Sequence, residues 1–229
     1  MADTLETLDK PHIVVVANGR FPHEDRLLPI IEAADAIVAA DGGANWLAAH
    51  GKNPDVLVGD MDSVSAELLA ALGKCHCRIV RHSPHKDETD TELALLEALA
   101  LGARQITLLG ALGGRTDHSL ANILLLAMPE LQAARVRIFD GISYLSIIHK
   151  VGVLHGEAGD ILSLLPIAGD AEGVATEGLE YPLRQETLPL GPARGVSNVF
   201  LQPVARVTVR RGKLLAVHTP RAYAEEADR

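Results

Sequence analysis

The chain has only two cysteines, Cys75 and Cys77, among its 229 residues. One residue separates them, so they do not form a disulfide framework, and this spacing lacks the second ligand pair of a zinc site. No segment reaches the roughly 18 apolar residues of a membrane span, and the acidic N-terminal segment does not have the basic start of a signal peptide. We therefore expect a cytoplasmic protein that does not act at a membrane.

Basic and aromatic residues are both scarce. The chain has 21 Lys and Arg against 30 Asp and Glu, a formal net charge of -9. A nucleic-acid backbone requires clustered basic side chains, so this balance argues against a nucleic-acid partner and favours cations or metal-bound anions. Aromatic residues make up 3% of the chain, so a ligand ring has few stacking partners. We expect Trp46 to pack against its own helix layer and Tyr181 to lie in the core.

Three common site motifs are also missing. There is no G-x-x-x-x-G-K-[ST] run, no G-x-G-x-x-G after the first apolar segment and no G-x-S-x-G. These absences exclude a P-loop protein, a Rossmann-type dinucleotide site and a nucleophile elbow. The remaining possibility is a site in which acidic side chains bind a metal ion and phosphate groups.

Apolar segments of two kinds alternate between residues 12 and 140. Short β-branched segments predict strands at 12–19, 35–43, 54–60, 77–82, 104–114 and 134–141, and longer segments with helical spacing predict helices at 25–34, 44–51, 65–73, 90–102 and 117–128. This alternation is typical of a mostly parallel sheet with crossover helices. Thr89 stands three residues before Glu92 and predicts a capping box, whereas Pro29 is expected to kink or shorten the first helix.

The pattern changes after about residue 141. Helical spacing disappears, and short apolar runs at 144–150, 152–157, 160–167 and 196–219 are interrupted by Gly and Pro. We expect an α/β domain over residues 1–142 and an all-β sandwich over 143–229, with a loose tail at 225–229.

Four polar clusters follow predicted strands of the first domain, at 41–45, 59–63, 86–92 and 113–118. Ligands of open α/β sheets bind at the carboxyl ends of the strands, so the four clusters should converge. Asp60 and Asp62 lie two apart on one loop, while Asp87 and Asp90 flank a helix start. Carboxylates at close range repel one another and recruit a hard cation such as Mg²⁺, which takes one or two carboxylates together with phosphate oxygens.

Each cluster also has a plainer interpretation. Asp87, Asp90 and Glu92 are compatible with acids that stabilise a helix N-terminus, and Ser63 with an N-cap. The glycine pairs at 42–43 and 113–114 fit close approach of a ligand and also tight turns. Arg115 beside Asp117 fits a phosphate clamp or a surface ion pair, and Lys86 fits a phosphate contact or a solvated lysine. Four clusters at four strand ends favour the ligand interpretation.

The motifs DGGAN (41–45), GDMDS (59–63), KDETDTE (86–92) and GGRTDHSLAN (113–122) resemble, in order, those of thiamine pyrophosphokinases. The resemblance continues through TEGLEYPL (176–183) and GVSNVF (195–200) and so covers most of the chain. It implies an enzyme that transfers the pyrophosphoryl group of ATP to the hydroxyethyl oxygen of thiamine, giving thiamine diphosphate and AMP. It also implies a homodimer with active sites at the subunit interface.

The same resemblance implies roles for individual residues. The expected catalytic residues are Asp60, Asp62, Asp87, Asp90 and Arg115, of which the four aspartates are also the expected Mg²⁺ ligands. From the chemistry of the transfer, and not from the resemblance, a nearby aspartate is expected to accept the alcohol proton, with Asp90 as the first choice. The residues expected to hold ATP and its phosphates are Asp41, Gly42, Gly43, Asn45, Lys86, Thr89, Gly114, Arg115 and Asp117. Those expected at thiamine are Asn122, Ser197 and Asn198.

Two other functions use the same residues. One is a Mg²⁺-dependent nucleotide phosphohydrolase or small-alcohol kinase, in which water or another alcohol is the acceptor. The other is a nucleotide-sensing module without catalysis. The identity of the products distinguishes these functions from pyrophosphoryl transfer.

Overall fold

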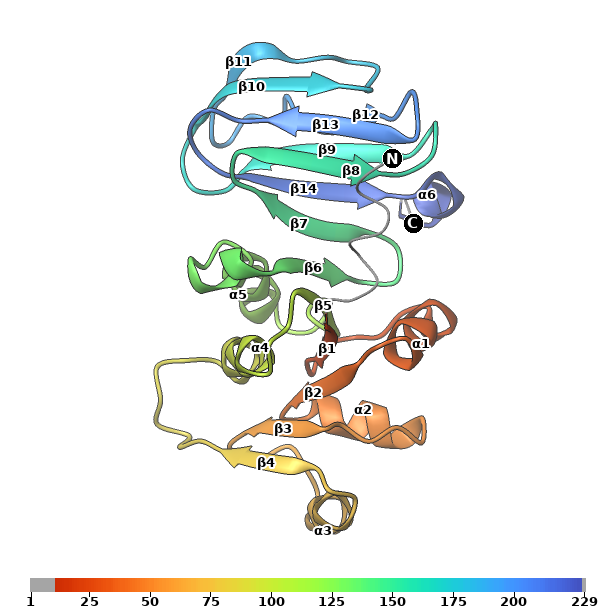
Figure 1. Cartoon of the computed structure of the whole chain (residues 1–229), viewed down its shortest axis with the longest axis vertical. Helices are drawn as coiled ribbons and strands as arrows, with labels where there is room; N and C mark the ends of the chain where they lie inside the picture. Colours follow the sequence, from red (N-terminus) through yellow and green to blue (C-terminus); the bar gives the residue numbers. More distant parts are fainter. Residues whose placement is uncertain (1–10, 228–229) are drawn as a thin grey trace. The chain divides into compact units, whose positions relative to one another are not determined.

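The computed structural model describes residues 11–227 (Figure 1). The chain divides into two compact units, the first ending at Gly141 and the second beginning at Ile142. No helix within the described residues is long and apolar enough to cross a membrane.

The first unit is built on a parallel sheet. Its strands are β1 (His12–Val16), β2 (Ala36–Ala40), β3 (Val56–Gly59), β4 (Arg78–Arg81), β5 (Gln105–Leu109) and β6 (Arg135–Phe139). Within this unit their order is β6-β5-β1-β2-β3-β4, and each neighbouring pair is parallel. Residues 13–16 of β1 are all buried, which explains the continuous apolar run in the sequence.

Helices cover both faces of this sheet. They are α1 (Glu24–Glu32), α2 (Gly43–Ala49), α3 (Ala66–Lys74), α4 (Asp90–Ala100) and α5 (Thr116–Leu125), followed by the short 3-10 helix η1 (Glu130–Ala133). Figure 1 shows α4 and α5 on one side of the strands and α1 and α2 on the other. The strand order explains this division of the helices between the two faces. The chain moves in one direction across the sheet from β1 to β4 and in the other direction from β4 to β5 and β6, and right-handed crossovers in opposite directions place their helices on opposite faces.

Local signals explain the helix ends. The Thr89 side chain accepts a hydrogen bond from the Glu92 N–H at 3.1 Å, as the predicted cap at the start of α4 requires. Ser65, not Ser63, caps α3 and accepts from the Leu68 N–H at 3.1 Å. Pro29 lies inside α1, which continues to Glu32, so it does not end the helix.

The second unit consists of two antiparallel sheets. Its strands are β7 (Tyr144–Ile148), β8 (Val151–His155), β9 (Ile161–Pro166), β10 (Ala171–Glu177), β11 (Arg184–Leu188), β12 (Asn198–Val199), β13 (Val204–Thr208) and β14 (Leu214–Thr219), before α6 (Arg221–Ala227). One sheet has the order β12-β9-β14-β7 and the other β11-β10-β13-β8. Alternate residues, such as Leu162 and Leu164 of β9 and Ala205 and Val207 of β13, fill a common core.

The predicted fold class, a mostly parallel α/β domain followed by a β sandwich, is confirmed. Strands β10 and β11 lie outside the segments predicted to be strands. Gly173 and Gln185 have positive φ in these strands, and the register shifts around Val174, so neither strand alternates regularly. The loose tail predicted at 225–229 is wrong for residues 225–227, which belong to α6, and residues 228–229 lie outside the described part.

The prediction that Tyr181 lies in the core is wrong, because the residue is 62% exposed. Its backbone N–H donates to Asn198 Oδ1 at 3.0 Å, and its carbonyl accepts from Asn198 Nδ2 at 2.7 Å. The main chain is therefore held by a buried amide while the ring remains at the surface.

Candidate active site

A pocket of about 510 Å³ opens at the carboxyl ends of β1 to β5 in the first unit. Its lining comes from the end of β2, from the loops after all five strands and from the first turns of α4 and α5. The lining residues are Ala17, Asn18, Gly19, Ala40, Asp41, Asp60, Asp62, Ser63, Pro84, Lys86, Glu88, Thr89, Asp90, Thr91, Gly110, Ala111, Gly114, Arg115, His118, Ser119 and Asn122. All four polar clusters predicted from the sequence contribute to it.

The position of the pocket follows from the strand order. The chain leaves β1 toward β2 and leaves β5 toward β6, so the connections from these two neighbouring strands run in opposite directions across the sheet. Such a switch point leaves a crevice at the carboxyl ends of the strands. Backbone hydrogen bonds from Gly19 N–H to the Gly110 carbonyl (2.7 Å) and from Arg20 N–H to the Leu112 carbonyl (2.9 Å) join the two loops beyond the strands.

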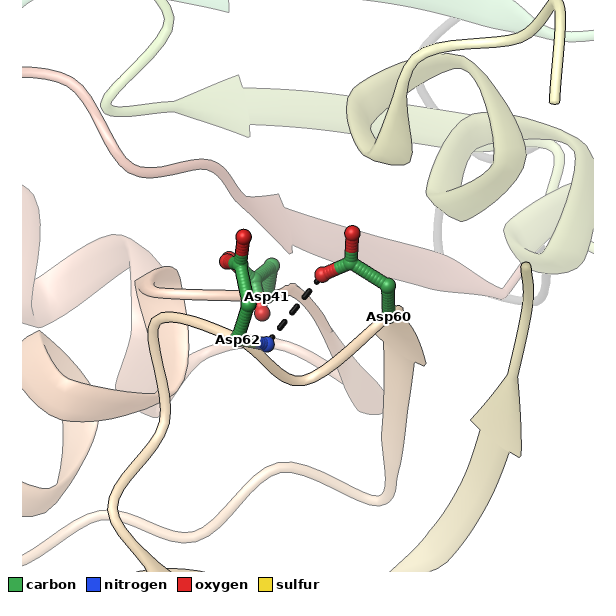
Figure 2. A group of neighbouring side chains, drawn as sticks. All are labelled: Asp41, Asp60 and Asp62. Carbon is green, nitrogen blue, oxygen red and sulfur yellow. Dashed lines mark hydrogen bonds between the residues drawn. The ribbon is translucent and has the colours of Figure 1, made fainter. Parts of the chain in front are cut away.

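Three carboxylates meet in the pocket. One oxygen each of Asp41, Asp60 and Asp62 lies within 4.8 Å of the other two (Figure 2). The Asp62 N–H donates to Asp60 Oδ1 at 3.1 Å, and Ser63 Oγ donates to Asp62 Oδ1 at 2.9 Å. Met61 between them has a φ of 70° and is buried, so the tight turn directs Met61 into the core and leaves the flanking carboxylates at the pocket.

Asp41 is the most constrained of the three. It is only 7% exposed, and its buried Oδ1 has no hydrogen-bond partner within the described residues. Burial raises the pKa of Asp41, and repulsion from Asp90 and Asp62 adds to this effect, while hydrogen bonding, including that from the Gly42 backbone, opposes it. A Cβ at Gly59 would lie 3.0 Å from Asp41 Cβ and 3.2 Å from Asp90 Oδ1, so only glycine fits comfortably there. The cluster therefore favours either a proton or a cation.

The loop before α4 supplies a cation, and the first residue of α4 supplies a fourth carboxylate. Lys86 Nζ lies 2.7 Å from Asp90 Oδ1, and both residues line the pocket together with Thr89. Asp87 is exposed and does not line the pocket. Of the four aspartates predicted as metal ligands, the structure brings Asp60 and Asp62 together with Asp41, places Asp90 beside Lys86 and leaves Asp87 outside.

The start of α5 supplies a second cation. Arg115 lines the pocket and donates from Nε to Asp117 Oδ1 (3.1 Å) and from Nη2 to Asp117 Oδ2 (2.6 Å). This pairing lowers the pKa of Asp117 and raises that of Arg115. Asp117 itself does not line the pocket, whereas Gly114 and Asn122 do. Asn122 is buried and donates from Nδ2 to the Ala111 carbonyl at 2.8 Å, which ties α5 to the loop after β5.

The remaining predicted residues lie elsewhere. Gly42 and Gly43 are buried. A Cβ at Gly42 would overlap the Asn18 side chain and one at Gly43 would overlap the Val16 carbonyl, so these glycines allow close packing against the protein itself. Asn45 does not line the pocket and donates from Nδ2 to the Ser63 carbonyl at 2.8 Å. These residues shape the turns that carry the carboxylates.

Ser197 and Asn198 belong to the second unit. The Ser197 N–H donates to Ser163 Oγ at 3.0 Å, and Ser197 is exposed. Asn198 is buried, and its amide bonds the backbone of Tyr181 and Val199. Asn198 therefore holds the loop that carries Ser197.

The predicted site residues did not include the lining residues Ala17, Asn18, Gly19, Ala40, Ser63, Pro84, Glu88, Thr91, Gly110, Ala111, His118 and Ser119. Two signals were present in the sequence. Asn18 follows the end of β1, at the same kind of position as Asp41 after β2. Arg115, Ser119 and Asn122 are three or four residues apart and therefore lie on one face at the start of α5.

Both units of the chain match models of known protein families. Residues 27–139 match the family model "Thiamin pyrophosphokinase, catalytic domain", and residues 148–214 match "Thiamin pyrophosphokinase, vitamin B1 binding domain". The chain belongs to the thiamin pyrophosphokinase family. The family expected from the sequence motifs is thus confirmed, and so is the class of enzyme, a thiamine diphosphokinase.

Individual relatives agree with this membership. The chain is 28% identical over 226 residues to thiamine pyrophosphokinase 1 of Oryza sativa subsp. japonica, covering 86% of this chain and 83% of the relative. It is 26% identical over 184 residues to thiamine pyrophosphokinase of Bacillus subtilis, covering 80% and 86%. The crystal structure of thiamine pyrophosphokinase from Bacillus subtilis has the same fold, with a TM-score of 0.79 over 91% of this chain and 99% of that chain, at 24% identity.

Proposed function

We propose that the pocket binds ATP with Mg²⁺ and transfers the pyrophosphoryl group to the hydroxyethyl oxygen of thiamine. The observation that carries this proposal is the meeting of Asp41, Asp60 and Asp62 beside two cations, Lys86 and Arg115, in a chain of this family. The thiamine oxygen forms a bond to the β-phosphorus of ATP, the bond from that phosphorus to the α,β-bridging oxygen breaks, and AMP leaves with the bridging oxygen.

The three clustered carboxylates are the proposed metal ligands. They offer only oxygen donors, and Asp41 Oδ1, which has no hydrogen-bond partner in the described part of the chain, supports a role in holding a cation or a proton. A bound Mg²⁺ supplies charge neutralisation on the phosphate oxygens. This set replaces the one expected from the sequence, because Asp87 does not line the pocket and Asp90 is paired with Lys86.

The cations and Asp90 have complementary roles in the proposal. Lys86 and Arg115 hold phosphate oxygens, and Gly114, Thr89 and Asn18 line the same surface. Asp90 accepts the proton of the thiamine hydroxyl, since it is a pocket carboxylate outside the metal cluster. Little covalent participation by the protein is required, because this transfer depends on positioning and charge neutralisation.

The second unit is the proposed source of thiamine contacts. The match to the vitamin B1 binding domain spans residues 148–214 and includes Ser197 and Asn198, which supports this role. Ser197 is the proposed contact and Asn198 its support, and Asn122 is a proposed contact from the first unit. A homodimer with sites at the subunit interface, acting in the cytoplasm, completes the proposal.

A phosphorus NMR time course of the purified chain with ATP, Mg²⁺ and thiamine tests this function, with controls that lack each component. Thiamine-dependent formation of AMP and thiamine diphosphate is expected. ADP or free phosphate as product, without dependence on thiamine, would indicate a nucleotide hydrolase or another kinase. Tight binding without any turnover would indicate a nucleotide-sensing module.

A further inference from the structure

An aromatic stack lies next to the wall of the pocket. The rings of Phe21, in the loop after β1, and Trp46, in α2, are stacked with centroids 4.3 Å apart and an interplanar angle of 12°. Trp46 Nε1 donates to Glu24 Oε1 at 2.9 Å, and the His50 ring lies 4.4 Å from Trp46 and 3.1 Å from Glu24 Oε2. The Trp46 ring is therefore held by α1 on one side and by its own helix on the other.

Phe21 contacts the loop after β5. Gly110 has a φ of 62°, and a Cβ at this position would overlap the Phe21 ring and lie 2.7 Å from the Ala17 carbonyl oxygen. Arg20 packs in the same way on Gly113, whose Cβ would lie 3.0 Å from that of Arg20. Consecutive side chains of the β1 loop thus rest on two glycines of the β5 loop, in addition to the backbone hydrogen bonds that join the loops.

The β5 loop leads directly to Arg115. Gly110, Ala111, Gly114 and Arg115 line the pocket, but Phe21 and Trp46 do not. Arg115 is also the N-cap residue of α5. The conformation of the loop at 110–114 therefore sets the position and direction from which the Arg115 side chain extends. The stack therefore contacts the structure that presents Arg115 without lining the pocket itself.

We propose that Phe21, clamped by Trp46, is a positioning residue that fixes the loop at 110–114 and so directs Arg115 to the phosphates. This inference rests on the proposed function, because it assumes that Arg115 binds the nucleotide. Catalysis by positioning is sensitive to displacements of about 1 Å, which can lower rates by about 100-fold. A partial loosening of the loop is expected to lower kcat/KM by about 10-fold.

A double-mutant cycle between Phe21 and Arg115 tests the proposal. Phe21→Leu keeps an apolar side chain but removes the stacked ring, and it is expected to lower kcat/KM for ATP by about 10-fold in the parent. In the background of Arg115→Gln, the same change is expected to cost less than about 2-fold, because the residue it positions is gone. Equal losses in both backgrounds would overturn the proposal.

The cycle needs a control for lost stability. Leu72 is fully buried on α3 and does not line the pocket, so Leu72→Ala lowers stability without touching the loop. Its small effect on kcat/KM is expected to be the same in the parent and in the Arg115→Gln background. If Leu72→Ala couples to Arg115→Gln as strongly as Phe21→Leu does, the coupling results from general loss of stability. That outcome would overturn the proposal.

Trp46 provides a readout besides activity, since it is the single tryptophan of the chain. Addition of ATP with Mg²⁺ is expected to change Trp46 emission in the parent and to change it much less in Phe21→Leu. Trp46→Phe keeps a stacked ring and is expected to retain kcat/KM within about 2-fold, whereas Trp46→Ala behaves like Phe21→Leu. Unchanged emission in the parent, or full activity of Trp46→Ala, would overturn the clamp.

The two proposals fail in different ways. A parent protein that forms no AMP from ATP and thiamine contradicts the proposed function. A parent that forms AMP but shows additive losses in the cycle contradicts only the role of Phe21.

Discussion

Lys86 Nζ lies 2.7 Å from Asp90 Oδ1, four residues along the chain and inside the pocket. The two side chains are 13% and 28% exposed, so solvent and salt screen this pair less than the ion pairs at the surface. Lys86 thereby neutralises Asp90 next to three further carboxylates. The arrangement also keeps a cation at the point where phosphate groups are proposed to bind.

Lys86→Met is expected to raise the KM for ATP by about 10-fold to 100-fold, because charge-assisted hydrogen bonds to phosphate are lost. Steady-state kinetics at saturating thiamine measures this change. Lys52→Met is the matched control: Lys52 pairs with Glu32 at 2.9 Å and does not line the pocket, so KM is expected to stay at the parent value. Equal KM values for the Lys86 variant and the parent would remove Lys86 from the phosphate site.

Asp62→Asn is expected to lower turnover by at least about 100-fold, since it removes a charge from the proposed metal cluster. The melting temperature is expected to remain close to that of the parent, because Asp62 is exposed. Electron paramagnetic resonance with Mn²⁺ in place of Mg²⁺ measures the loss of metal binding directly. Asp87→Asn is the control, and it also decides between the two ligand sets. A loss of Mn²⁺ binding in Asp87→Asn as large as that in Asp62→Asn would support the set expected from the sequence, whereas binding retained in Asp62→Asn would contradict both sets.

Most of the fold was predictable because burial on both faces leaves a simple pattern. Continuous apolar strands such as β1, alternating with segments of helical spacing, indicate a covered parallel sheet, and the Thr89 cap marked the start of α4. Strands β10 and β11 were missed because their pairing is irregular. A positive φ at Gly173 and at Gln185 interrupts the alternation on which strand prediction depends.

The candidate site was predictable at the level of loops and less so at the level of side chains. Parallel strands bring their carboxyl ends to one edge, so four polar clusters at strand ends had to lie close together. Which side chain faces the pocket depends on turns that spacing does not encode. A φ of 41° at Asp41 and of 70° at Met61 sets the geometry of the three-aspartate cluster, while Asp87 in a similar acidic run stays exposed.

Asp160→Ala is expected to destabilise the protein by about 3 kcal/mol at pH 7, because a buried carboxylate with several donors is lost. Asp160 is 4% exposed and accepts from His218 Nε2 (2.8 Å) and from the N–H groups of Glu157 (2.9 Å) and Arg221 (2.8 Å). Burial opposes ionisation, but these hydrogen bonds outweigh it and lower the pKa of Asp160.

The sign of this pKa change gives a pH dependence. A carboxyl group with a lowered folded-state pKa stabilises the protein above its unfolded pKa of about 3.9, and this contribution is lost as pH falls through the folded value. Urea denaturation is therefore expected to show a full difference between parent and variant at pH 7 that shrinks below about pH 4. Asp170→Ala serves as control, since Asp170 accepts one exposed hydrogen bond from the Leu190 N–H and its loss is expected to cost under about 1 kcal/mol.

Asp41→Asn is expected to make the protein more stable at neutral pH while lowering turnover by at least about 100-fold. Burial and two neighbouring carboxylates raise the pKa of Asp41, so the folded state favours its protonated form. The stability from this group is present below the unfolded pKa of about 3.9 and is lost as pH rises through the folded value. At pH 7 this carboxyl group therefore contributes less stability than it does at low pH, a loss that neutral asparagine does not have, and asparagine tolerates the φ of 41° at this position.

Thermal denaturation at pH 7 and at pH 4, with and without Mg²⁺, measures this effect. The Asp41→Asn variant is expected to melt above the parent at pH 7, and the gain is expected to shrink at pH 4. Mg²⁺ is expected to raise the melting temperature of the parent more than that of the variant, because the cation neutralises the charge that the substitution removes. A variant that melts below the parent at pH 7, or that gains as much from Mg²⁺, would show that Asp41 is not held as a strained metal ligand.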